Sequence, residues 1–130
     1  MTAVRPEPAF EHESEAYELF RRAVWFLERG HPGQAAQLLE RALALEPGRN
    51  SIREALGRAL FGLGRLEGAA EQFAGIITDA PDNDYAQYAL GRCLLRLGRL
   101  EEGRGRLRLA AALAPHRRLY SETLSGLEQV

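Results

Sequence analysis

Lysine is absent from this sequence and cysteine occurs once, and each shortage narrows what the chain can do. All 17 basic residues are arginine, and 18 acidic residues bring the formal net charge to −1. This near-neutral balance argues against a general nucleic-acid binder or membrane-surface binder. A single cysteine, Cys93, cannot form an intramolecular disulfide or a cysteine-based zinc site.

Long apolar runs are missing as well. No uncharged apolar stretch approaches the roughly 20 residues that a membrane helix needs. The first eight residues contain two prolines and two charges, so they lack the apolar core of a signal peptide. We therefore expect a soluble, cytoplasmic protein.

Glycine and proline recur at a fixed interval along the chain. Three of the glycines, Gly30, Gly64 and Gly98, are spaced by 34 residues. Three of the prolines have the same spacing, Pro47, Pro81 and Pro115. The segment Leu-Gly-Arg-Leu-Glu at 63–67 returns unchanged at 97–101. Within a unit, apolar residues recur at helical spacing, glycine breaks the run, and proline ends the second run. The pattern predicts pairs of helices, and no strand-like alternation interrupts it.

This pattern resembles the tetratricopeptide repeat, a 34-residue helix-turn-helix unit. When the units are numbered from Ala16, Asn50 and Asp84, proline stands at position 32 of each. The small residue that the family has at position 8 is matched by Ala23, Gly57 and Gly91. Three residues depart from the family pattern without removing the period: Arg22 at position 7, Ile76 at position 27 and Gly103 at position 20.

The resemblance implies an all-α fold, a right-handed superhelix (α-solenoid) of three helix-turn-helix repeats. Because the last repeat of a solenoid exposes an apolar face, we expect a C-terminal capping helix as well. The expected parts are an N-terminal tail (1–15), three repeats (16–49, 50–83 and 84–117) and the capping helix (118–130). The tail is expected to be partly disordered or to fold back on the first repeat.

The two ends of the solenoid carry apolar residues that need cover. The capping helix has a predicted apolar stripe of Leu119, Tyr120, Leu124 and Leu127. At the other end, Trp25 stands at position 10 of the first unit, which has no preceding repeat to pack against. We expect Phe10 and the segment 10–15 to fold back over Trp25, and the alternative is that Trp25 forms a homodimer contact.

We find no constellation of residues for catalysis. The three histidines, His12, His31 and His116, have no metal-ligand spacing to one another. Cys93 lies at a position that should be buried, and no histidine is placed to activate it. We therefore expect a protein that is not an enzyme and that has no metal or cofactor.

In this family the first helices of successive repeats line a concave groove that receives a partner peptide. Members that bind chaperone C-termini do so through a carboxylate clamp of Lys, Arg and Asn side chains. The clamp positions in this sequence are Phe20, Val24, Ala55, Tyr85 and Ala89. None of them can donate a charged hydrogen bond, so the chain should lack a chaperone-type carboxylate clamp.

The groove positions carry aromatic residues and arginine instead. The predicted groove residues are Tyr17, Phe20, Val24, Arg58, Phe61, Tyr85, Tyr88, Arg92 and Arg96. Tyrosine and arginine are frequent hot-spot residues at interfaces. We expect the groove to hold an apolar segment with acidic residues, which would meet the arginines. Alternatively, several of these aromatic residues only complete the packing between helices, and this applies above all to the groove positions Phe20 and Leu27.

Charge is uneven along the chain. Residues 1–48 carry a net charge of −3, whereas residues 84–118 carry +5. The third-repeat arginines are expected to form a solvated helix face, with RNA or an acidic ligand as the rival interpretation. The sequence thus predicts a non-catalytic adaptor for a protein or peptide partner. A homo-oligomerisation module is the alternative, and the chain could be a monomer or a homodimer.

Overall fold

The three repeating glycines end the first helix of each helix pair. Gly30, Gly64 and Gly98 have φ angles of 76°, 75° and 83°, a left-handed conformation that costs glycine little. At the first turn, the Gly30 N–H donates to the carbonyl of Leu27, and the His31 N–H donates to the carbonyl of Phe26. This pair of hydrogen bonds is a Schellman motif, and it recurs at the other two turns. The predicted left-handed turns are confirmed.

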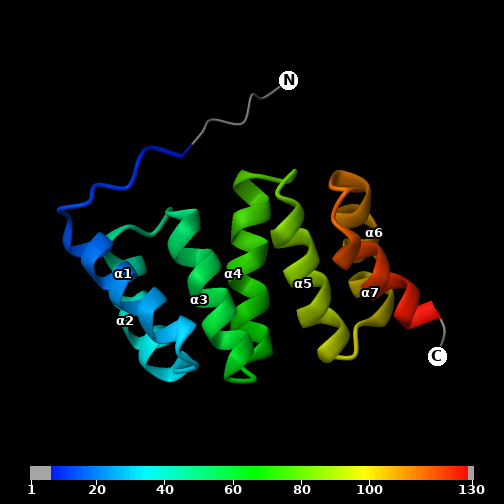
Figure 1. Ribbon diagram of the computed structural model, residues 1–130, viewed down its shortest axis with the longest axis horizontal. Helices are drawn as coiled ribbons and strands as arrows, with labels where there is room; N and C mark the ends of the chain where they lie inside the picture. The colour runs from blue at the N-terminus through cyan, green and yellow to red at the C-terminus, as the bar shows by residue number, and fades with distance from the viewer. Residues whose placement is uncertain (1–6, 129–130) are drawn as a thin grey trace.

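The computed structural model describes residues 7–128, which form seven helices and no strand. The helices are α1 (Glu15–Glu28), α2 (Pro32–Leu45), α3 (Asn50–Gly62), α4 (Leu66–Asp79), α5 (Asp84–Arg96), α6 (Leu100–Leu113) and α7 (Arg118–Glu128). They follow one another along the long axis, and each packs mainly against its neighbours in the chain (Figure 1). The expected all-α helical-repeat solenoid is confirmed.

We call the helix pairs α1–α2, α3–α4 and α5–α6 the first, second and third repeats. The expectation of disorder in the N-terminal tail also concerns residues 1–6, which lie outside the described residues. Residues 129–130, the last two of the expected capping segment, lie outside them as well.

Small residues allow the paired helices to approach closely. A Cβ atom added at Gly57 would lie 2.7 Å from the Phe73 ring. One added at Gly103 would lie 2.8 Å from Leu95 and 3.0 Å from the carbonyl oxygen of Gly91. Gly103, which departs from the family pattern, therefore sits where α5 and α6 leave no room for a side chain. The helix propensity that this glycine costs α6 is offset by closer packing.

The capping helix packs through one face. Tyr120 is 1% exposed, and its ring lies 4.8 Å from that of Tyr88, while Leu124 and Leu127 pack against the same cluster. Leu119, in contrast, is 55% exposed, so its place in the predicted apolar stripe is wrong. The residues that pack follow i, i+4, i+7 spacing, and Leu119 lies about 100° around the helix from Tyr120.

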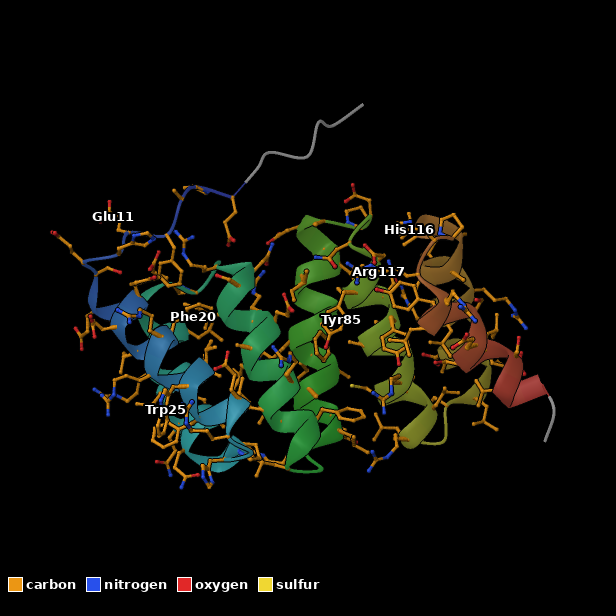
Figure 2. All side chains as sticks on the ribbon, viewed as in Figure 1. Glu11, Phe20, Trp25, Tyr85, His116 and Arg117 are labelled. Carbon is orange, nitrogen blue, oxygen red and sulfur yellow. The ribbon has the colours of Figure 1, made fainter. Side chains whose placement is uncertain are left out.

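The prediction that Phe10 covers Trp25 is also wrong. Trp25 is 49% exposed, and the guanidinium carbon of Arg29 lies 3.9 Å from its ring centre. The Phe10 ring instead packs 5.4 Å from that of Phe20, and Figure 2 shows Trp25 further along α1. The tail leads directly into the first turn of α1, whereas Trp25 lies about 15 Å from the start of the helix. Residues 7–14, the described part of the tail, therefore pack on the first repeat without covering Trp25.

Candidate functional site

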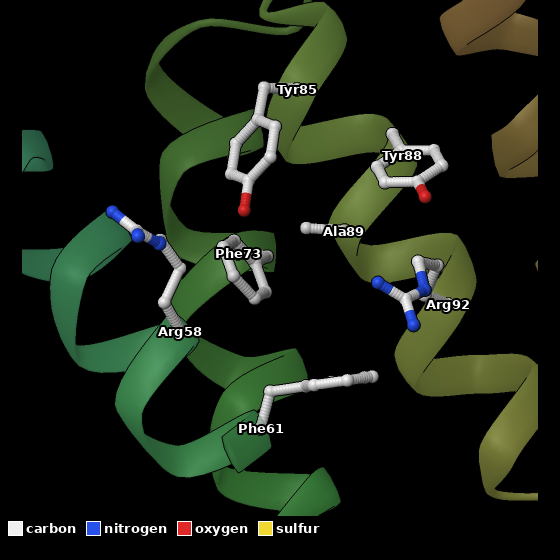
Figure 3. A pocket seen from close by; sticks show the side chains of 7 residues that line it. All are labelled: Arg58, Phe61, Phe73, Tyr85, Tyr88, Ala89 and Arg92. Atoms are coloured by element: carbon white, nitrogen blue, oxygen red, sulfur yellow. The ribbon is translucent and has the colours of Figure 1, made fainter. Parts of the chain in front are cut away.

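A cavity of about 210 Å³ opens between the second and third repeats (Figure 3). Helices α3, α4 and α5 all contribute to it. The lining residues are Arg58, Phe61, Phe73, Tyr85, Tyr88, Ala89 and Arg92. We call this space the aromatic cavity.

The aromatic walls of the cavity are held by packing from behind. Phe73 is 1% exposed, and its ring meets that of Tyr85 edge-on at 6.2 Å and 78°. Tyr88 is 7% exposed because Tyr120 of the capping helix lies against it. Rings that are fixed in this way lose little conformational entropy when a ligand binds.

Arginines surround the opening of the cavity. The guanidinium carbon of Arg92 lies 4.8 Å from the ring centre of Phe61, and that of Arg96 lies 5.2 Å from the same ring. Stacking on an aromatic ring leaves the edge of a guanidinium group free to donate hydrogen bonds. Arg58 approaches from α3 on another side (Figure 3).

These three arginines have no acidic partner in the part of the chain that the structure describes. Other arginines do have one, such as Arg53, whose Nη1 lies 2.9 Å from the carboxylate of Asp79. No ion pair within residues 7–128 includes Arg58, Arg92 or Arg96. The aromatic cavity therefore combines an apolar interior with positive charge that the described residues leave unpaired.

The charges around the cavity also act on Tyr85. Burial raises the pKa of the Tyr85 hydroxyl above its ordinary value of 10.0, although the positive charge of Arg58 opposes this rise. The hydroxyl is therefore protonated at neutral pH and can donate a hydrogen bond to an acceptor in the cavity.

The structure brings together most of the predicted groove residues. Arg58, Phe61, Tyr85, Tyr88 and Arg92 line the aromatic cavity, and Arg96 lies beside it. The other three predicted residues, Tyr17, Phe20 and Val24, belong to α1 and lie apart from the cavity.

Sequence reasoning missed Phe73 and Ala89 as cavity residues. Phe73 belongs to α4, a second helix of a repeat, whereas the groove was expected only from first helices. Gly57 is the signal that could have found it, because the absence of a side chain there makes room for the Phe73 ring. Ala89 stands at one of the carboxylate-clamp positions, so the repeat pattern places it in the groove, although it was not among the predicted groove residues.

The single cysteine, Cys93, is placed in the packed interior of the repeats. Cys93 is fully buried, and burial raises the pKa of its thiol to about 11, so it carries no nucleophilic thiolate at neutral pH. Within residues 7–128, no group of three or more His, Cys, Asp and Glu side chains could hold a metal ion. None of the described helices is long and apolar enough to span a membrane.

The sequence matches two profile models of the tetratricopeptide repeat family, one over residues 20–84 and the other over residues 67–125. Together with the helix pairs described above, these matches establish that the chain belongs to the tetratricopeptide repeat family. Membership of this family supports a general role in protein interaction. No curated protein matches the sequence.

Solved structures of similar fold include proteins with a bound peptide. The first TPR of Spaghetti (RPAP3), bound to the HSP90 peptide SRMEEVD, superimposes with a TM-score of 0.82 at 16% identity, covering 88% of this chain and 91% of that one. YrrB, described as a TPR protein with an unusual peptide-binding site, superimposes with a TM-score of 0.80 at 22% identity, covering 85% of this chain and 57% of that one. The Yersinia enterocolitica type III secretion translocator chaperone SycD superimposes with a TM-score of 0.76 at 19% identity, covering 88% of this chain and 89% of that one. Likeness at these identities establishes the fold alone.

Proposed function

We propose that this chain is a non-catalytic adaptor that binds a partner protein through a short acidic and apolar segment. One apolar side chain of that segment enters the aromatic cavity, and neighbouring carboxylates meet Arg58, Arg92 and Arg96. The observation that carries the proposal is the set of three arginines without acidic partners beside an open aromatic cavity.

The size of the cavity favours a peptide side chain over a small molecule. Sites for drug-sized ligands usually occupy about 300–1,000 Å³, whereas this cavity measures about 210 Å³. Burial of a Leu or Phe side chain contributes roughly 1.5–3 kcal/mol. A hydrogen bond from an arginine to a carboxylate adds about 1.5–3 kcal/mol. Together these contributions suit a transient adaptor complex.

The acidic groups of the ligand are proposed to be side chains and not a C-terminal carboxylate. The clamp positions hold Phe20, Val24, Ala55, Tyr85 and Ala89. Ala55 and Ala89 are buried, and none of the five side chains carries a positive charge. The proposed ligand therefore does not depend on a free C-terminal carboxylate.

The test uses a fluorescein-labelled probe peptide, Glu-Glu-Leu-Phe-Glu-Glu, and fluorescence polarisation. We expect the wild-type chain to bind the probe and the Arg58→Gln, Arg92→Gln double variant to bind it at least about tenfold more weakly, since each lost charged hydrogen bond costs about 1.5 kcal/mol. Higher salt should weaken binding by the wild type, because the arginines are exposed.

The matched control is Arg108→Gln, which removes the same charge from an exposed arginine on α6, away from the cavity. This variant should bind the probe as the wild type does. Equal binding by the double variant and the wild type, or a wild type that does not bind the probe, would overturn the proposed function.

The rival site consists of the third-repeat arginines outside the aromatic cavity, and contacts within the chain partly neutralise them. Arg104 pairs with Glu101 at 3.2 Å, and Arg99 pairs with Glu102 at 3.7 Å. These contacts favour a solvated helix face over a site for RNA or an acidic ligand. The absence of enzyme activity and the cytoplasmic location that the sequence suggests stay predictions.

A further inference from the structure

The described part of the N-terminal tail is held against the first two repeats. We call residues 7–14 the N-terminal strap. Helix α3 starts after Arg49, whose side chain makes no capping hydrogen bond. The carboxylate of Glu7 in the strap accepts a hydrogen bond from the N–H of Asn50 instead, which satisfies one of the free N–H groups at that helix end. Arg49 in turn donates from Nη1 to the carbonyl of Pro8 at 2.8 Å.

These anchors bring Phe10 onto α1. Its ring meets that of Tyr17 edge-on at 5.2 Å and that of Phe20 at 5.4 Å. The guanidinium carbon of Arg49, the residue before α3, lies 4.3 Å from the ring centre of Phe10. Phe10 thus sits among two aromatic rings and one guanidinium group, which we call the first-repeat subsite.

The first-repeat subsite and the aromatic cavity are related by the repeat. Tyr17 and Phe20 stand at positions 2 and 5 of their unit, and Tyr85 and Tyr88 stand at the same positions two units later. The corresponding residues of the second unit are Ser51 and Glu54. The chain therefore carries two aromatic pairs at equivalent positions, one beside an open cavity and one covered by Phe10.

The strap has the composition that the proposed function assigns to a ligand. Its single aromatic residue, Phe10, lies between acidic residues at Glu7, Glu11 and Glu13. Its contacts match the apolar part of that assignment, because the Phe10 ring meets two rings and an arginine. The carboxylate of Glu7 binds a backbone N–H at the start of α3 and does not pair with an arginine.

We propose that the N-terminal strap is an internal ligand whose Phe10 fills a second peptide subsite in the first repeat. A partner segment with an aromatic side chain among acidic residues takes the place of Phe10 when it binds there. The inference rests on the proposed function, because it assumes that this face of the repeats binds such segments. Since the strap is part of the same chain, it acts at an effective concentration on the order of millimolar, and it excludes a partner present at micromolar concentration.

The test uses a labelled peptide with the sequence of residues 7–14 and full-length chains in which the aromatic cavity is silenced by Arg58→Gln and Arg92→Gln. In this background we expect no binding at micromolar peptide concentration while the strap is intact. Adding Phe10→Ala empties the subsite and should improve peptide binding by about tenfold or more. A peptide whose phenylalanine is replaced by alanine should not bind.

A second variant, Glu7→Gln, guards against effects of Phe10→Ala on folding. It weakens the strap's anchor on α3 and leaves the subsite residues unchanged, so it should give a smaller gain in binding. Trp25→Ala changes a residue of α1 that does not contact the strap, so it should give no gain in peptide binding. If neither Phe10→Ala nor Glu7→Gln improves binding, the strap proposal is overturned. That result leaves the proposed function standing as long as Arg58→Gln, Arg92→Gln weakens binding of the Glu-Glu-Leu-Phe-Glu-Glu probe.

Discussion

Gly57 leaves room for one ring of the aromatic cavity although it does not line the cavity itself. The Phe73 ring lies where a side chain at Gly57 would stand, and this position lets the ring form part of the cavity wall. A single missing Cβ atom thereby links the packing of α3 on α4 to the shape of the candidate site.

We predict opposite effects for two glycine-to-alanine substitutions. Gly57→Ala forces the Phe73 ring to move and should lower the free energy of unfolding by about 1–3 kcal/mol, the usual cost of overpacking. Gly105→Ala adds a Cβ atom in open space within α6 and should raise it by up to about 1 kcal/mol through helix propensity. Urea denaturation of both variants measures the two effects. A Gly57→Ala variant as stable as the wild type would contradict this account of the packing.

At the scale of the helices, the fold could be predicted from the sequence because its signals are local and repeated. Glycine at Gly30, Gly64 and Gly98 marks a backbone conformation that other residues rarely adopt. The two wrong predictions concern helix faces that no further repeat covers. Trp25 and Leu119 both lie at the ends of the solenoid, and periodicity alone does not say what covers a terminal face.

The candidate site could be predicted in part for a similar reason. Arg58, Phe61 and Arg92 occupy repeat positions that face one side of the solenoid, so their proximity follows from the period. The contribution of Phe73 depends on its contact with Gly57 between two helices. The position of Phe10 depends on Arg49, far from it in sequence. Such contacts arise from packing and have no period to reveal them.

The hydroxyl of Tyr120 contributes to the docking of α7. The Tyr120 O–H donates to the carboxylate of Asp84 at 2.7 Å and accepts from Arg117 at 3.2 Å. We predict that Tyr120→Phe lowers the free energy of unfolding by about 1–2 kcal/mol, because Asp84 loses a charged hydrogen bond. Leu119→Ala, at an exposed position of the same helix, should change it by less than about 0.5 kcal/mol. Thermal denaturation followed by circular dichroism checks both, and equal losses would refute the assignment.

Because of the same hydroxyl, we predict that the free energy of unfolding depends on pH in the alkaline range. Burial, with the hydrogen bond to Asp84, raises the pKa of Tyr120 to about 12 from its ordinary value of 10.0. The phenolate is therefore less favourable in the folded chain than in the unfolded one. This contribution to stability is complete below pH 10 and is lost as the pH rises through about 12. Tyr120→Phe should lack this loss, which pH-dependent urea denaturation measures.

At the scale of the whole molecule, the exposed face of α1 bears on self-association. Glu18, Arg22 and Trp25 occupy positions 3, 7 and 10 of the first unit. The residues at these positions of the second unit, Ile52, Leu56 and Ala59, are buried against the first repeat. Charged residues at two of the three positions make this face of α1 a poor surface for stacking, because burying an unpaired charge is costly.

We therefore predict that the chain is a monomer at micromolar concentration. Sedimentation equilibrium of the wild type should give the mass of one chain, and Trp25→Ala should leave that mass unchanged. A dimer that dissociates in the Trp25→Ala variant would contradict this prediction and would favour the homo-oligomerisation module instead.

The most direct test of the central claim is to locate the bound peptide. Chemical-shift perturbation in ¹H–¹⁵N spectra of the wild-type chain, titrated with unlabelled Glu-Glu-Leu-Phe-Glu-Glu, reports the contact residue by residue. We predict that the shifts concentrate on the residues of α3 and α5 that line the aromatic cavity, Arg58, Phe61, Tyr85, Tyr88, Ala89 and Arg92. Shifts confined to the arginines of α6 or to the outer face of α1, or no shifts at all, would contradict it.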